Sequence, residues 1–218
     1  MTQRSRVTSI YTSINMHEEI LSSEQKDLLP LVKSFSDKFG LVGGTAIALH
    51  LGHRRSIDFD LFSFEEFDSS KIKRKIKTQA VIDKTLRDES SQYTLIINGV
   101  HFTFFQYPYP IVYSVPVERW IHIPDLLTLA AMKAFALAHR AKWKDYIDLY
   151  FILKDYHSLG EIGAKGKELF AGEFNEKIFR TQLSYFDDVN YTEEVTYLPG
   201  FEIEDNIVKE ALTKFSIQ

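Results

Sequence analysis

The chain has 218 residues, of which 44% are hydrophobic, 26% charged and 14% aromatic, a composition typical of a soluble globular protein. It contains no cysteine, which excludes disulfides and thiolate metal sites and is typical of a reducing cytosol. Residues 1–13 lack the apolar segment of a signal peptide, and no run of about 18 apolar residues occurs anywhere, so we expect a cytoplasmic protein without a membrane partner.

Charge is distributed unevenly along the chain. The net charge of −4 argues against a generally basic nucleic-acid binder, yet five of the seven residues 71–77 are basic. Residues 181–208, in contrast, contain seven acids and no Lys or Arg. Solvated helix faces or loops account for such runs. A groove that binds RNA or phosphates is the second interpretation of the basic run.

The first elements alternate between helical and strand patterns. One or two helices are expected over residues 17–39, with Pro30 as a break or kink. Residues 40–44, GLVGG, are predicted to form a short strand that enters a turn. Residues 45–52 are predicted to form a helix that stops at its final glycine. The alternating residues 56–62, SIDFDLF, are predicted to form a strand.

A strand-rich stretch is expected next. A helix near residues 69–78 precedes predicted strands over residues 80–88, 91–97 and 100–108. Asn98-Gly99 joins the last two, and both residues tolerate the positive φ that a type I′ hairpin turn requires. Loops are then expected at Pro108, Pro110 and Pro116.

From Asp125 onward the pattern is helical. Asp125 is a predicted N-cap, and an apolar stripe follows at Leu126, Leu129, Met132 and Phe135. If one helix continues through this region, Lys133, Arg140 and Lys144 share nearly one face. If the helix breaks near residues 140–143, Asp145 lies in the first turn of a new helix.

Two aspartates interrupt the otherwise apolar strand 56–62. Residues i and i+2 of a strand point to the same side, about 6.5 to 7 Å apart, so Asp58 and Asp60 project together. The same alternation directs Ile57, Phe59 and Leu61 to the core. Two carboxylates this close repel each other unless a cation joins them. Mg²⁺, or Mn²⁺, takes oxygen ligands and holds nucleotide phosphates, so a metal site is predicted here.

A glycine pair precedes these aspartates. Gly43 and Gly44 allow the backbone to come close to a phosphate, and the helix that follows offers N–H groups and a favourable dipole. Thr45 adds a hydroxyl donor. The strand, the turn, the helix and the acidic strand together predict a phosphate site opposite a metal.

These residues carry a family resemblance. The motif GGT, followed by DFD, resembles the signature of the nucleotidyltransferase superfamily that includes DNA polymerase β. Residues 41–63, LVGGTAIALHLGHRRSIDFDLFS, together with residues 130–153, AAMKAFALAHRAKWKDYIDLYFIL, resemble the AbiEii/AbiGii toxin family of nucleotidyltransferases. Similar proteins are often toxins of bacterial toxin–antitoxin or abortive-infection systems.

The resemblance implies a role for each matching residue. The phosphate-binding turn corresponds to Gly43, Gly44 and Thr45, and the metal-binding pair to Asp58 and Asp60. Lys133 corresponds to a residue that contacts the triphosphate, and Asp145 to an acid that completes the site, with Asp148 nearby. Residues of the family's HR.S stretch are expected to position phosphates, namely Arg54, Arg55 and Ser56.

One position departs from the superfamily pattern. Polymerase-β-like enzymes place a third carboxylate on a later strand, but residues 90–117 contain no Asp or Glu. The strand expected to carry it offers His101, Thr103 or Gln106 instead. Three explanations remain open: a ligand from the helical half, Asp145 or Asp148; a site with one ion; or weak catalysis.

Each of these residues also has a purely structural interpretation. The glycine pair forms a tight turn, and the two aspartates lie on the exposed face of an edge strand. Lys133 is then a surface lysine beside an apolar stripe, and Asp145 a first-turn acid. Structural or surface positions are also expected of the histidines His53, His101 and His139.

The predicted architecture is α+β with a nucleotidyltransferase fold: a small mixed sheet flanked by helices and a helical C-terminal half. Residues 1–123 are expected to form the core, and residues 124–218 to complete the active cleft. The expected activity transfers a nucleotide from a nucleoside triphosphate to the hydroxyl of an RNA or tRNA 3′ end or of a protein, with release of pyrophosphate. A cognate antitoxin is a further expected partner.

Two alternatives to this function are open. The first is a catalytically weak module of the same fold that binds a nucleotide or a partner. The second is a phosphohydrolase of the haloacid dehalogenase type, whose Asp-x-Asp motif DFD superficially matches. That family expects Thr or Val four residues after the first Asp, where Phe62 stands.

Overall fold

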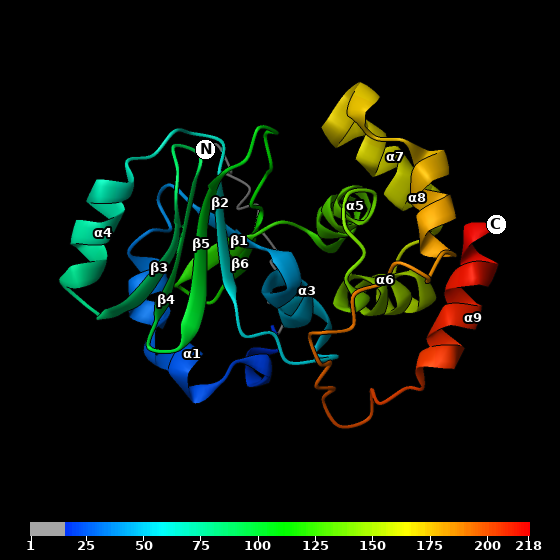
Figure 1. Ribbon diagram of the computed structural model, residues 1–218, viewed down its shortest axis with the longest axis horizontal. Coiled ribbons are helices and arrows are strands. Elements are labelled where there is room, and N and C mark those ends of the chain that lie inside the picture. Colours follow the sequence, from blue (N-terminus) through cyan, green and yellow to red (C-terminus); the bar gives the residue numbers. More distant parts are fainter. Residues whose placement is uncertain (1–15) are drawn as a thin grey trace, which may run out of the picture.

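The computed structural model describes residues 16–218, so the expectation about a signal peptide and the first residues of the predicted core lie outside the described residues. The protein has a mixed five-stranded sheet on one side and a group of helices on the other, with α3 between them (Figure 1). The predicted α+β class is therefore confirmed. None of the helices within residues 16–218 is long and apolar enough to cross a membrane.

The N-terminal region forms two separate helices, which was one of the two possibilities predicted for residues 17–39. A 3₁₀ turn, Glu18–Ile20, precedes α1 (Ser23–Asp27) and α2 (Leu29–Lys33). Ser22 caps α1 in a capping box with Gln25. Pro30 lies in the first turn of α2, where its missing N–H leaves no helical hydrogen bond unmade.

The sheet has the strand order β1-β2-β5-β4-β3. Strand β2 pairs parallel with β5, and the other neighbours pair antiparallel. The strands are β1 (Gly40–Val42), β2 (Phe59–Ser63), β3 (Ile82–Asp88), β4 (Gln92–Ile97) and β5 (Val100–Gln106). All five were predicted. Asn98 and Gly99 have φ of 49° and 76°, which confirms the hairpin turn.

The start of β2 corrects the predicted strand over residues 56–62. The chain joins the sheet only at Phe59, so Asp58 precedes the strand. Phe59 and Leu61 are fully buried as expected, but Ile57 is 57% exposed, and its predicted place in the core is wrong. Alternation holds only where the backbone is paired.

The loop predicted around Pro116 is also wrong. Val115–Val117 (β6) and Ile121–Ile123 (β7) pair into an antiparallel two-stranded ribbon. Pro116 lies in β6 opposite His122 and is exposed. A proline is tolerated in such a ribbon because β6 has a pairing partner on only one side.

Two helices flank the sheet. Helix α3 (Gly43–Leu51) ends at Gly52, whose φ of 67° is the left-handed cap that the sequence predicted. Helix α4 (Ser69–Lys77) is capped by Asp68, which accepts hydrogen bonds from Ser70 N and Lys71 N. Its Ile72 and Ile76 are buried, whereas its basic residues are exposed.

The second half of the described chain is helical. It contains α5 (Leu126–Leu137), α6 (Trp143–Asp155), α7 (Leu159–Phe170), a 3₁₀ turn (Ala171–Glu173), α8 (Glu176–Leu183) and α9 (Asp205–Ser216). Asp125 caps α5 as predicted. The break between α5 and α6 excludes one continuous helix and places Asp145 in the first turn of α6.

The two faces of the sheet have different roles. On one face the buried Phe104 of β5 packs against Phe35, with ring centroids 4.9 Å apart. Lys75 of α4 lies over the ring of Phe35, so α4 covers this same face. The alternate residues of β2 and β5, such as Asp60 and Thr103, are only half-buried and line a cavity together with residues of α3 and α5. This second face forms one wall of the candidate site.

Candidate active site

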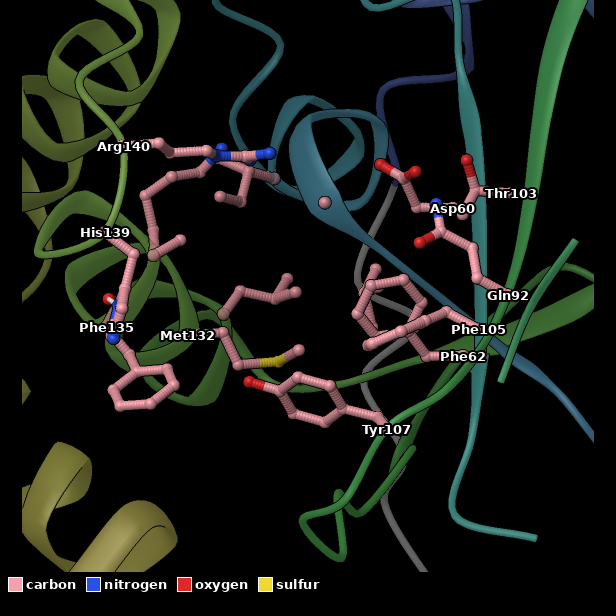
Figure 2. Close-up of a pocket in the computed structure, with 16 residues that line it drawn as sticks. Asp60, Phe62, Gln92, Thr103, Phe105, Tyr107, Met132, Phe135, His139 and Arg140 are labelled. Carbon is pink, nitrogen blue, oxygen red and sulfur yellow. Dashed lines mark hydrogen bonds between the residues drawn. The ribbon is translucent and has the colours of Figure 1, made fainter. Parts of the chain in front are cut away.

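A cavity of about 440 Å³ lies between the sheet and α5 (Figure 2). This volume is in the range of small-molecule sites. One end is polar and is lined by Gly43, Asp60, Thr103, Lys133 and Arg140. The other end is mainly apolar and is lined by residues of the sheet and α5, among them Phe62, Phe105, Tyr107, Met132 and Phe135.

The glycine turn and the acidic strand meet at the polar end. Val42 pairs with Asp60 across β1 and β2, which brings Gly43 beside the Asp60 carboxylate. Gly43 has φ of 70°, and a Cβ at this position would lie 2.2 Å from Asp60 Oδ2. Glycine is therefore required here both by the backbone conformation and by the close approach of the carboxylate.

The start of α3 is surrounded by hydrogen-bond donors. A Cβ on Gly44 would lie 2.7 Å from Arg54 Nη2 and 3.0 Å from Ser56 Oγ. The Thr45 hydroxyl donates to the Asp58 carbonyl oxygen and lies 3.0 Å from Ser56 Oγ. No side chain in the described part of the chain caps α3, so its first N–H groups can serve an anion.

Arg54 and Arg55 point in different directions. The Arg54 side chain is 2% exposed and reaches the α3 turn. Arg55 is exposed, and its guanidinium approaches the carbonyl oxygen of Glu19 at 3.4 Å. Arg55 does not line the cavity, whereas its neighbour Ser56 is buried beside the turn. Arg54 does not line the cavity either, but of the two arginines it is the one beside the start of α3.

The environment of Asp60 suits a bound cation. Burial raises the pKa of Asp60 to about 6, and the negative charge of Asp58 adds to this shift. Lys133, Arg140 and the Thr103 hydroxyl act in the opposite direction. A carboxylate that is desolvated beside a second carboxylate is stabilised by a divalent cation, so the donor set fits Mg²⁺ or Mn²⁺.

The expected third carboxylate has a threonine in its place. Thr103 pairs with Asp60 in the register of β2 and β5. Among the residues that the structure describes, no group of three or more His, Asp or Glu side chains is placed to hold a metal. Asp145 and Asp148 bind cations of the protein instead. Of the two aspartates predicted to hold a metal, Asp60 lines the cavity, whereas Asp58 is half-buried before β2 and does not line it.

A buried network of charges lies behind the polar end. Asp148 accepts two hydrogen bonds from Arg54, at 2.7 Å from Nε and 2.8 Å from Nη2, and one from His53 Nε2 at 2.8 Å. Lys133 Nζ donates to Asp145 Oδ1 at 2.7 Å and lies 3.1 Å from Asp148 Oδ2. The two acids are three residues apart on α6 and share one helix face.

The network fixes the charge states of its members. Burial opposes ionisation of Asp148, but Arg54, Lys133 and the hydrogen bond from His53 hold its pKa well below the ordinary value. Burial also disfavours the charged form of Lys133, yet Asp145 and Asp148 raise its pKa. Burial lowers the pKa of His53, so its imidazole is neutral near pH 7. Arg54 and Lys133 are therefore permanent cations at the site.

Several sequence-based interpretations are settled by these positions. Lys133 is 6% exposed and is not a surface lysine. Asp145 is 3% exposed and pairs with Lys133. His53 is buried and His139 is exposed, as expected of structural or surface histidines, and His139 also lines the cavity. Arg140, on the linker between α5 and α6, was not assigned to the site by sequence, although the predicted helix break brings it there.

A segment far along the chain holds two of the site loops. Residues 190–198, here called the crossing segment, run between α8 and α9 (orange in Figure 1). Arg55 N donates to Thr196 O and Leu198 N to His53 O, at 2.8 and 3.0 Å. Trp143 N donates to Asn190 O at 3.0 Å. The segment thereby ties the loop before β2 to the start of α6.

The crossing segment also pairs with two basic residues at the start of α6, Lys142 and Lys144. Glu193 forms ion pairs with Lys142 and Lys144, and these charges lower its pKa, with the hydrogen bond from Lys142 as the largest cause. Arg140 is 55% exposed, lies 3.4 Å from Asp145 Oδ2 and points toward the polar end of the cavity (Figure 2). Of these three cations, Arg140 is the one that lines the cavity.

Fold comparisons identify the class of this architecture. The structure is similar to JHP933 from Helicobacter pylori, with a TM-score of 0.55, 17% identity and coverage of 90% of this chain and 92% of that chain. It is also similar to MenT4, a nucleotidyltransferase toxin of Mycobacterium tuberculosis H37Rv, with a TM-score of 0.56, 11% identity and coverage of 89% and 84%. The predicted nucleotidyltransferase fold is thus confirmed.

Sequence comparisons identify the family within this class. Residues 31–118 match the family described as "Nucleotidyl transferase AbiEii toxin, Type IV TA system". An uncharacterized protein of Aquifex aeolicus, aq_aa25, is 34% identical over 175 residues, which cover 77% of this chain and 84% of that protein. The chain belongs to the AbiEii nucleotidyltransferase toxin family. The haloacid dehalogenase interpretation of DFD is therefore wrong.

Proposed function

We propose that this protein is a metal-dependent nucleotidyltransferase that moves a nucleotide from a nucleoside triphosphate to an acceptor hydroxyl and releases pyrophosphate. The observation that carries the proposal is the two-ended cavity, in which Gly43, Asp60, Lys133 and Arg140 line one end and aromatic rings line the other. A nucleoside triphosphate has the same division into a charged and an apolar part. Family membership supports the same activity.

The phosphate groups would lie at the polar end. The first N–H groups of α3 and the Ser56 hydroxyl can donate to phosphate oxygens. Arg54 and Lys133 add fixed positive charge behind them. Asp58 and Asp60 would hold Mg²⁺ or Mn²⁺, which when bound supplies charge neutralisation and orients the phosphates.

The transfer step needs in-line positioning more than covalent chemistry. The acceptor oxygen forms a bond to the α-phosphorus while the bond from that phosphorus to the bridging oxygen of pyrophosphate breaks. Arg140 and Lys133 stabilise the charge that develops on the phosphates. The acceptor's proton passes to Asp60 rather than to Asp145, because Asp60 lines the cavity and Asp145 is hydrogen-bonded to Lys133.

The biological role in the proposal is that of a toxin in the cytoplasm, neutralised by a cognate antitoxin protein. The description of the matching family as a toxin of a toxin–antitoxin system supports this role. The acceptor hydroxyl belongs to an RNA, such as the 3′ end of a tRNA, or to a protein. The alternative function, a nucleotide-binding module with weak turnover, is favoured by Thr103, which stands where a third carboxylate was expected.

A labelling experiment separates these functions. Purified protein is incubated with each α-labelled nucleoside triphosphate, Mg²⁺, and total RNA or a protein extract, and pyrophosphate release is measured in parallel. We expect label on one acceptor class and loss of it in Asp58→Ala and Asp60→Ala. The matched control is Asp83→Ala, an exposed acid of β3 away from the cavity. Label that persists in both site variants contradicts transfer that depends on Asp58 and Asp60, and triphosphate binding without pyrophosphate release supports the alternative.

A further inference from the structure

We propose that the apolar end of the cavity is a slot for the nucleobase, formed by Phe62, Phe105 and Tyr107 on the sheet side and by Met132 and Phe135 on α5. This inference rests on the proposed function, since it places the base of the same nucleoside triphosphate. It assigns a substrate orientation: the phosphates lie toward Asp60 and the base toward Tyr107.

The register of the sheet places the polar and apolar ends of the cavity next to each other. Asp60 and Phe62 alternate on β2, and their partners on β5 are Thr103 and Phe105. One row across the sheet is therefore polar and the next is aromatic, about 7 Å further along the strands. Figure 2 shows Asp60 and Thr103 along one side of the cavity and Tyr107 at the opposite end.

The aromatic rings of the second row form a continuous wall. The ring centroid of Phe62 lies 5.1 Å from that of Phe105 and 5.2 Å from that of Tyr107. All three side chains are half-buried, whereas the neighbouring core residues Phe102 and Phe104 are fully buried. The wall thus leaves ring surface open to the cavity, and ring surface of this kind stacks on any base.

Helix α5 supplies the opposite side of the slot. Met132 and Phe135 line the cavity across from the wall (Figure 2). The Phe135 ring stacks on Phe170 of α7, with centroids 4.2 Å apart and planes 14° apart, so its position is fixed by packing. Two apolar sides that face each other fit a flat aromatic ligand.

Polar groups at the edge of the slot can read the base. Gln92 pairs with Phe105 across β4 and β5 and lines the cavity. Its Nε2 donates to Thr94 Oγ1 at 3.0 Å, so Oε1 is the atom of this side chain that can accept from a base N–H. Burial raises the pKa of Tyr107, which keeps its hydroxyl protonated as a second polar group.

The charges of the site set the direction of the nucleotide. The cations Lys133 and Arg140 line the polar end, and Arg54 lies behind it, all three paired with Asp145 or Asp148. The side chains of the aromatic wall carry no charge, so a phosphate placed against them would lose its water without a counter-ion. A base placed against the wall loses little hydration free energy, because its ring faces are apolar.

The test compares binding of ATP, GTP, CTP and UTP with binding of inorganic tripolyphosphate, each with Mg²⁺ and without RNA, by titration calorimetry. We expect Phe105→Ala and Tyr107→Ala to weaken binding of the preferred nucleotide by about ten-fold or more and to leave tripolyphosphate affinity unchanged. Phe105→Leu keeps apolar volume and removes the ring, so it serves if the alanine variant does not fold. Gln92→Leu is expected to narrow the differences among the four nucleotides.

The matched control is Phe67→Ala, a half-buried phenylalanine that packs on Phe39 and does not line the cavity. It should leave both ligands unaffected. Nucleotide binding that is unchanged in Phe105→Ala and Tyr107→Ala, or that falls equally with tripolyphosphate binding, overturns the slot and leaves the proposed function standing. A wild-type protein that binds neither ligand overturns the proposed function and the slot with it. Because RNA is absent, a base of the acceptor cannot account for the result.

Discussion

Gly43 is the residue on which the geometry of the polar end most depends. Its positive φ and its contact with the Asp60 carboxylate are two separate requirements, and a side chain violates both. Gly99, in the β4–β5 turn, has a similar φ of 76° but open space around the position of a Cβ. Comparing substitutions at the two glycines therefore distinguishes the effect of backbone strain from the effect of displacing the Asp60 carboxylate.

We expect Gly43→Ala to reduce transfer by about 100-fold or more, because it displaces Asp60 by a substantial part of an ångström. Backbone strain should lower the free energy of unfolding by about 1 to 2 kcal/mol. Gly99→Ala should show a similar loss of stability, measured by urea unfolding, with unchanged activity. If Gly99→Ala reduces activity as much as Gly43→Ala does, lost stability rather than site geometry explains the effect.

Asp148 is the residue that balances the buried cations. Replacing it with asparagine leaves Arg54 and Lys133 buried with less compensating charge, and we expect Asp148→Asn to cost about 3 to 5 kcal/mol in the free energy of unfolding. Asp145→Asn is the control and should cost less, because Lys133 keeps Asp148 as a partner. Equal losses of unfolding free energy in the two variants, measured by urea unfolding, would show that Asp148 is not the main counter-ion of the buried cations.

The same residue gives a pH dependence with a defined sign. The folded-state pKa of Asp148 is depressed, so its contribution to stability is present above the unfolded-state pKa of about 4. That contribution declines as pH falls below about 4 and is lost as pH passes through the folded-state pKa. We therefore expect the difference in unfolding free energy between wild type and Asp148→Asn to shrink below pH 4. A constant difference from pH 7 to pH 3 would contradict an ionised Asp148.

At the scale of elements, the linker between α5 and α6 decides which cations reach the cavity. Because α5 ends at Leu137 and α6 begins at Trp143, Arg140 lies on the linker and lines the cavity. Lys142, two residues later, pairs with Glu193 of the crossing segment. The Arg140 and Lys142 side chains are 55% and 41% exposed, but of the two only Arg140 lines the cavity.

We expect Arg140→Ala to reduce transfer and tripolyphosphate affinity by about 10- to 100-fold. Arg140 is exposed, and the buried Asp145 keeps Lys133 as its partner, so the free energy of unfolding should change by less than about 1 kcal/mol. Lys142→Ala on the same linker should leave both transfer and tripolyphosphate affinity unchanged. Equal effects of the two variants in a pyrophosphate-release assay would show that net charge, rather than the position of Arg140, matters.

Local sequence patterns predicted elements better than the contacts between them. The positive φ of Asn98 and Gly99 follows from residue type, and so does the end of α3 at Gly52. The exposure of Ile57 does not, because it depends on where β2 first finds a partner strand. The bond between His53 and Asp148 joins residues 95 positions apart, and such a pair has no local signal.

The aromatic slot was missed for a similar reason. Phe62 and Phe105 do not stand out in the sequence, since each belongs to a strand with several apolar residues. They become one wall only through the parallel register of β2 and β5, which nothing local specifies. Asp58 and Asp60 are different, because the two carboxylates lie within three residues and their proximity can be predicted from the local sequence. Of the residues that the sequence assigned to a site, Gly43, Asp60 and Lys133 line the polar end of the cavity and Asp58 does not, and no residue of the apolar end was assigned.

At the scale of the whole molecule, the basic residues of α4 lie apart from Lys142 and Lys144. Lys142 and Lys144 are neutralised by Glu193 near the cavity. Helix α4 lies across the sheet from α3 and α5 (Figure 1). Within residues 16–218 no acid forms an ion pair with the five cations of α4, namely Lys71, Lys73, Arg74, Lys75 and Lys77. The basic residues of α4 therefore form an exposed face on the side of the sheet away from the cavity (Figure 1), and this face is available to a long acceptor.

We expect the variant with glutamine at Lys71, Lys73, Arg74 and Lys77 to keep nucleotide and tripolyphosphate affinity while its affinity for RNA falls. Lys75 is retained because it donates to Ser34 O and packs on Phe35. The slope of log affinity against log salt should become shallower by about 0.7 for each RNA phosphate that the variant no longer neutralises. The control carries glutamine at Lys154, Lys165 and Lys167, each already paired with an acid. An unchanged RNA affinity and salt slope in the α4 variant would direct the search for the acceptor to proteins.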